Sequence, residues 1–155
     1  MRILKWALIS FAIILLGAQF VRPARTNPSF EQSRTIVSHA TVPREVAAVL
    51  KRACNDCHSH ETVWPWYSNV APVSWLLIDH VNEGRREMNF SDWARYDARQ
   101  ADHLLEEICK EVKLGNMPLS SYVTLHPDAK LSDEEKQLIC DWANAERQRL
   151  ALQAR

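Results

Sequence analysis

The run Cys54-Asn-Asp-Cys57-His58 carries the most specific chemistry in this sequence. Its two thiols are three residues apart, so both can add to the two vinyl groups of a single haem. The histidine that follows then lies beneath the iron as its proximal ligand. We therefore expect Cys54 and Cys57 to hold one haem covalently, as haem c, and His58 to bind the iron.

Two other kinds of site use the same thiol spacing. A structural zinc site needs a second Cys or His pair at ligand spacing, and the remaining cysteines, Cys109 and Cys140, stand alone. A thioredoxin-like redox pair needs a βαβ context, which the hydrophobic pattern does not show. A zinc-binding or thiol-redox module is therefore kept as a less favoured alternative to a haem site. Whether Cys109 and Cys140 pair with each other is left open.

A second axial ligand is sought downstream of the motif. Met117 follows Gly115-Asn and precedes Pro118, just beyond a predicted helix end. Its thioether is a soft, neutral donor that favours ferrous iron and raises the reduction potential. His80 on a predicted helix and His126 in the following link are the alternative distal ligands. Met117 can also be a packing residue, so the distal position stays open.

An aromatic run, Trp64-Pro-Trp-Tyr67, comes shortly after the motif. One interpretation makes Trp64 and Tyr67 part of the cofactor site, as a crevice wall whose indole N–H or hydroxyl donates to a haem propionate. The other interpretation is a hydrophobic cluster that pins a long loop.

Composition limits the remaining possibilities. The chain has 155 residues, of which 46% are hydrophobic, and 19 basic residues balance 19 acidic ones. This length suits one domain, and the zero net charge makes nucleic acid an unexpected partner. With only 3 glycines, no phosphate-binding loop or dinucleotide fingerprint can form. Few glycines also disfavour a many-stranded β-barrel.

The N-terminal segment is expected to direct export. Residues 6–21 carry no charge and follow Arg2 and Lys5, so 1–22 is interpreted as a signal-anchor or a signal peptide. Sixteen residues make roughly 24 Å of helix, which is marginal for a membrane span. A single-pass inner-membrane protein with a periplasmic domain is favoured over a cleaved, periplasmic form. A flexible tether is expected over 23–41.

The remaining part, 42–150, is predicted to be a small all-α domain of about four helices with long loops. Apolar residues recur at helical spacing, and Pro43, Gly115 and the capping box Ser132–Glu135 mark helix ends. Ser91 is predicted to cap the third helix, and the tail from Ala143 is predicted to fray. The helices are expected from Pro43 to Cys54, over 72–87, over 91–114 with a bend, and from Ser132 onward.

Two stretches, CNDCHSHETVWPWYSNVAPVSWLLIDHVNEGRREMNFSDW and GNMPLSSYVTLHPDAKLSDEEKQLICDW, resemble the bacterial haem-binding domain family. Its members are membrane-anchored or exported proteins with one C-x-x-C-H motif, and the resemblance covers about Val46 to Trp142. It implies covalent haem on Cys54 and Cys57. The part from Met117 to Trp142 also resembles the C-terminal half of class I c-type cytochromes, where that Met is the second axial ligand. The long aromatic insertion departs from the cytochromes.

The expected protein is therefore a membrane-tethered monohaem c-type cytochrome that transfers single electrons to an unknown redox partner protein. No nucleophile or general-base pair argues for turnover, so an electron carrier is favoured over an enzyme. If Met117 does not bind the iron, the open site suits a sensor of diatomic gas or peroxide, or a weak peroxidase.

Overall fold

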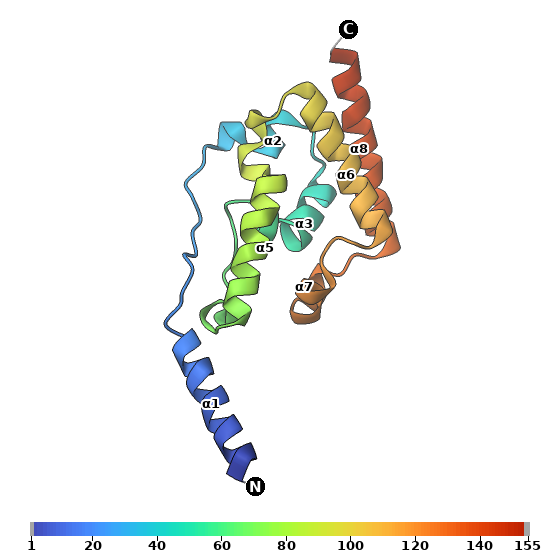
Figure 1. Cartoon of the computed structure of the whole chain (residues 1–155). Coiled ribbons are helices and arrows are strands. Elements are labelled where there is room, and N and C mark those ends of the chain that lie inside the picture. Colours follow the sequence, from blue (N-terminus) through green and yellow to red (C-terminus); the bar gives the residue numbers. More distant parts are fainter. Residues whose placement is uncertain (1, 154–155) are drawn as a thin grey trace.

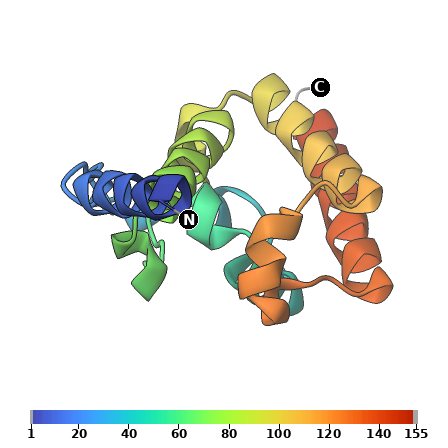
Figure 2. The same cartoon turned by 60° about the horizontal axis from the view of Figure 1, so that its bottom comes forward.

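The computed structural model describes residues 2–153, and these contain helices and loops without a β-strand (Figure 1). The prediction of an all-α fold is confirmed. Two long helices, α6 (Ala98–Leu114) and α8 (Asp133–Gln153), run antiparallel and side by side (Figures 1 and 2). Their facing apolar side chains include Leu105 and Ile139, both fully buried. This helix pair forms one side of the core.

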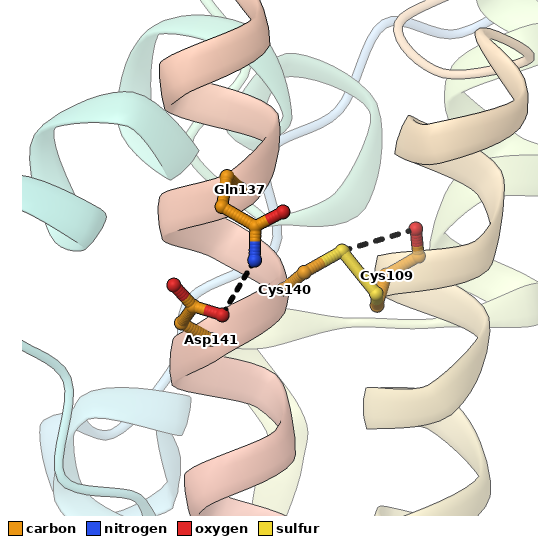
Figure 3. The surroundings of a disulfide bond; sticks show 4 residues. All are labelled: Cys109, Gln137, Cys140 and Asp141. Carbon is orange, nitrogen blue, oxygen red and sulfur yellow. Dashed lines mark hydrogen bonds between the residues drawn. A yellow bond between two sulfur atoms is a disulfide. The ribbon is translucent and has the colours of Figure 1, made fainter.

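A disulfide joins these two helices. Cys109 of α6 bonds to Cys140 of α8, with the Cα atoms 4.6 Å apart (Figure 3). The bond closes a loop of 31 residues, which in the chain-entropy account stabilises the fold by about 3 to 4 kcal/mol. The sequence pattern puts Cys109 and Cys140 on the apolar faces of two predicted helices, but it leaves open whether the two cysteines pair.

The other side of the core begins with α3 (Arg44–Ala53), which has four buried apolar residues at helical spacing. The short α4 (Asn55–His58) follows directly and contains Cys57 and His58. Helix α5 (Val73–Glu87) packs across α4, and Val81 and Gly84 are buried on the contacting side. Helices α3 and α5 match the predicted helices near their expected bounds, whereas the short α4 was not predicted.

The helix predicted over 91–114 is two elements. The segment η3 (Phe90–Arg95) is a 3₁₀-helix, and α6 starts only after it. The predicted cap at Ser91 is wrong: the Asp97 side chain accepts the Gln100 backbone N–H at 2.8 Å, completing a capping box. The expected bend is present. It lies between η3 and α6, where Asp97 caps the second of the two elements.

The C-terminal helix begins as predicted and extends further than predicted. The Ser132 hydroxyl accepts the Glu135 N–H at 3.2 Å, and the Glu135 carboxylate accepts the Ser132 N–H at 2.9 Å. The tail does not fray through Gln153, because Ala143 and Glu146 are buried and Arg149 donates to the Glu146 carboxylate at 2.7 Å. Arg149 also reaches the His39 carbonyl, which ties the helix to the N-terminal part.

The two long loops predicted between the helices, over 58–71 and 116–131, contain short helices. The first contains η2 (Trp66–Asn69), and the second contains α7 (Ser120–Leu125) and η4 (Pro127–Ala129). Within the predicted tether, η1 (Gln32–Arg34) and α2 (Ile36–His39) also form, and Ile36 is buried in the core. The packed part of the molecule therefore includes residues on the N-terminal side of 42.

The N-terminal helix α1 (Arg2–Ala18) extends away from the other helices (Figure 1). Its 17 residues correspond to roughly 26 Å of helix, shorter than a hydrocarbon core of about 30 Å. No helix within residues 2–153 is both long and apolar enough to cross a membrane. The predicted transmembrane helix is thus not supported.

Gly84 allows α5 to lie directly against α4. A Cβ atom at this position would come within 2.7 Å of the Cys57 carbonyl oxygen. Gly84→Ala should therefore lower the free energy of unfolding by about 1 to 3 kcal/mol, because backbone atoms must move apart. Gly17→Ala is the matched control, since nothing lies within 4 Å of that site. Denaturant unfolding measures both, and equal stability of the two variants would contradict the assigned contact.

Candidate functional site

Four of the predicted haem residues line a crevice between α4, α5, α6 and α7: Cys54, Cys57, His58 and Met117. It consists of two lobes of about 310 and 320 Å³, which share Ala53, Cys54, His58, Glu87 and Met117 in their walls. Such volumes are typical of sites that enclose a small molecule or cofactor. The sequence motif and the methionine, 59 positions apart from His58 to Met117, thus face one space.

The two lobes differ in their surroundings. The first lies against α6 and is mainly apolar, with Leu104, Ile108 and Val112 in its wall. The second lies between α5 and α7 and includes His80, Leu119 and Tyr122. Figure 2 shows α7 between α5 and the pair of α6 and α8. Both lobes are mainly apolar and suit a flat hydrophobic group, and each also has a few polar side chains in its wall.

The imidazole ring of His58 is oriented by a hydrogen bond to a backbone carbonyl at the end of another helix. Its Nδ1 lies 3.1 Å from the Met88 carbonyl oxygen. Because a carbonyl only accepts, Nδ1 carries the proton and Nε2 keeps a free lone pair. Burial lowers the pKa of His58, which favours this neutral form. A neutral imidazole whose second nitrogen bonds a carbonyl is the usual arrangement of a metal-binding histidine.

The cysteines of the motif are not activated as a redox pair. Burial raises the pKa of Cys54 to about 12 and that of Cys57 to about 11. Reactive thiols in disulfide exchange have a lowered pKa, so this environment gives the thiol-redox alternative no support. Among residues 2–153, no group of three or more His, Cys, Asp or Glu side chains is arranged to hold a metal ion. The zinc alternative gains no support either.

Met117 is positioned by the end of α6. Gly115 adopts a left-handed conformation with φ of 74°, which side chains disfavour, and this ends the helix. The Glu111 carbonyl then accepts the N–H groups of Asn116 at 3.0 Å and Met117 at 3.2 Å. The Met117 backbone is therefore held by α6, and its half-buried side chain lines both lobes. The predicted helix stop at Gly115 is confirmed.

The alternative distal ligands are placed differently. His80 lines only the second lobe. His126 lies outside the lining of both lobes as far as the described residues show, and both its nitrogens have partners. The Tyr122 carbonyl lies 3.2 Å from Nδ1, and the Tyr67 hydroxyl lies 3.3 Å from Nε2. Met117 thus lines both lobes beside the motif, whereas His80 lines one lobe and His126 lines neither.

The aromatic run lies beside the crevice rather than in its described lining. Trp64 and Tyr67 are both half-buried, and neither belongs to the residues that line the two lobes. The Tyr67 ring contacts His126 edge-on, with ring centres 6.0 Å apart. Whether either residue contacts a bound cofactor stays a prediction.

Two further residues, Tyr122 and Arg85, hold the motif in place. The Tyr122 hydroxyl donates to the Asp56 carboxylate at 2.7 Å, which links α7 to α4. Burial and this hydrogen bond raise the pKa of Tyr122. Arg85 of α5 donates to the Ser59 carbonyl at 2.7 Å and to the Thr62 hydroxyl at 2.8 Å. No local pattern indicates these contacts, because each joins residues more than 20 positions apart.

The walls of the crevice carry acidic residues. Glu87, Glu107 and Glu111 contribute to the first lobe, and Glu83 joins Glu87 in the second. Lys110 lies 3.0 Å from the Glu107 carboxylate. Arg86 lies 3.4 Å from the Glu83 carboxylate and 3.9 Å from that of Glu87, so two cations partly balance the four carboxylates. Electrostatically, the crevice therefore combines an apolar interior with an excess of negative charge.

Comparison with known proteins agrees with this site. A family model described as "Haem-binding domain" matches residues 13–145, which is most of the chain and includes every residue of the crevice. No curated protein and no solved structure gives a match. The family match, together with the motif and the crevice, identifies the chain as a member of the haem-binding domain family.

Proposed function

We propose that this haem-binding domain attaches one haem covalently through Cys54 and Cys57 and transfers single electrons. The observation that carries the proposal is the oriented imidazole of His58, whose Nδ1 is bonded to the Met88 carbonyl at 3.1 Å inside a crevice that both thiols line. The remaining lone pair on Nε2 is the natural axial donor. A bound haem would supply a metal centre that cycles between ferric and ferrous states.

The donor set and the walls fit such a group. His58 offers a nitrogen donor, Met117 a thioether, and Leu104, Ile108 and Val112 an apolar wall for a macrocycle. The chain's own contribution is to hold the two ligands and to exclude water from the apolar lobe. Rigid ligands lower the reorganisation that accompanies a change of charge, which is what an electron carrier requires.

Export is the second part of the proposal. We interpret α1 with Arg2 and Lys5 as a signal-anchor or signal peptide that directs the domain to the periplasmic side of the inner membrane. The Cys109–Cys140 disulfide supports this interpretation, because such bonds persist in oxidising compartments. Covalent haem attachment also belongs to the exported side of the membrane.

Covalent attachment is tested by denaturing gels stained for haem. Protein from an export-competent bacterial host should keep its stain after denaturation, because thioether bonds survive unfolding. The double variant Cys54→Ala, Cys57→Ala should lose the stain completely. The matched control is Cys109→Ala, Cys140→Ala, which removes two other cysteines and should keep it. An unstained wild-type band, or staining that survives in the first variant, contradicts covalent attachment.

The distal ligand is tested by replacing Met117. Met117→Ala should abolish the near-infrared absorption of a methionine-to-ferric-iron bond and let the ferrous protein bind carbon monoxide rapidly. Met88→Ala is the matched control: it removes another methionine side chain from the same crevice, while its carbonyl stays available to His58. An unchanged Met117→Ala spectrum shifts the assignment to His80. Rapid carbon monoxide binding by the wild type favours the gas or peroxide sensor.

The acidic walls predict how small redox reagents react. Oxidation of the reduced protein by cationic tris(phenanthroline)cobalt(III) should slow as salt is added, whereas oxidation by anionic ferricyanide should speed up. Glu107→Gln with Glu111→Gln should reduce both salt effects. Glu134→Gln, on an exposed residue outside the crevice lining, should leave them unchanged. Stopped-flow kinetics measures these rates for the wild type and both variants with each reagent. Identical salt responses to the two reagents would refute the electrostatic interpretation.

A further inference from the structure

Helix α1 has an uncovered apolar surface on all its sides. None of its residues is buried among the described part of the chain, and exposed Trp6, Phe11 and Leu16 are spaced around the whole circumference of the helix. A helix that is apolar all round is stable only where something apolar surrounds it, in a protein core or in lipid. Residues 2–153 provide no such core around it.

The position of α1 on the folded body is set by hydrogen bonds. The Gln19 side chain donates to the Ala71 carbonyl at 3.0 Å and accepts the Ala71 N–H at 3.1 Å. The Trp75 indole donates to the Val21 carbonyl at 2.7 Å. These contacts join the end of α1 to the start of α5, as Figure 1 shows. The end of the folded domain where α5 begins therefore lies next to α1.

The same end of the body carries exposed apolar side chains of its own. Trp66 in η2 is 77% exposed, and the neighbouring apolar residues of the α5 start are exposed as well. We name this surface the basal patch, and it consists of Trp66, Val70, Val73 and Leu76. It is continuous in sequence with Ala71 and Trp75, which hold α1. The basal patch and α1 thus form one apolar region.

We propose that the basal patch rests on a lipid bilayer surface, beside the point where α1 enters the lipid. Two features favour lipid over a protein partner. Arg22 and Arg25 follow α1 at the level of the patch, where cations meet lipid phosphates. Trp66 presents an indole, the side chain that prefers the boundary between headgroups and acyl chains. A helix too short to span the bilayer gains binding from this second contact.

This inference rests on the membrane association in the proposed function and not on the haem. It also orients the domain. Helix α7, which carries Tyr122 of the crevice wall, lies at the same end of the body as the start of α5 (Figure 1). The second lobe therefore lies near the lipid surface. The far ends of α6 and α8 project away from it.

The test is a nitroxide spin label at position 66 in the full-length holoprotein. Trp66→Cys is labelled in vesicles of phosphatidylcholine and phosphatidylglycerol, and its collisions with oxygen and with a water-soluble nickel chelate are compared. Val37→Cys is the matched control, 57% exposed on α2 at the opposite end of the body (Figure 1). We expect oxygen to dominate at position 66 by several-fold and the nickel chelate to dominate at position 37.

Unaltered protein is labelled in parallel, because Cys54 and Cys57 react only if no haem occupies their sulfurs. That control separates a failure of haem attachment from a failure of the lipid contact. If the protein floats with vesicles but position 66 collides mainly with the nickel chelate, the basal patch is not a lipid contact. If the protein does not float with vesicles, the lipid contact and the membrane association both fall.

Discussion

The close approach of α5 to α4 is the constraint on which the crevice depends. Gly84 brings the α5 backbone against Cys57, and one turn later the helix ends at Met88, whose N–H bonds the Gly84 carbonyl at 2.9 Å. The Met88 carbonyl is then free to accept from His58. One missing side chain and one helix end therefore decide both the position of the motif and the orientation of its imidazole.

The opposite wall depends on a second, independent framework. Helix α6 is fixed to α8 by apolar packing and by the Cys109–Cys140 bond, and it ends at Gly115 just before Met117. The two proposed iron ligands thus belong to different halves of the fold. Tyr122 bridges these halves through Asp56. Each wall of the crevice is thus held by contacts of its own, and the Tyr122–Asp56 hydrogen bond links the two.

Local signals explain what the sequence predicted well. The glycine stop at Gly115, the capping box at Ser132 and the apolar spacing of α3 each depend on residues within one or two helical turns. The prediction fails at the third long helix, where it puts the cap at Ser91 and the structure instead uses Asp97. The Tyr122–Asp56 and Arg85–Ser59 contacts escaped prediction because they join residues 66 and 26 positions apart. Only the tertiary fold brings such partners together.

If the crevice holds a haem iron as proposed, its side chains would exert two opposing influences on that iron. As an iron ligand, the Met117 thioether would favour the ferrous state, because it is a soft and neutral donor. Glu87, Glu107 and Glu111 place negative charge around the first lobe and favour the ferric state, which carries one more positive charge. The carboxylates act through partly aqueous surroundings and are weakened by salt, whereas a direct bond is not. In the proposed haem-bound state, the ligand would therefore determine the broad range of the reduction potential, and the acidic walls would adjust it within that range.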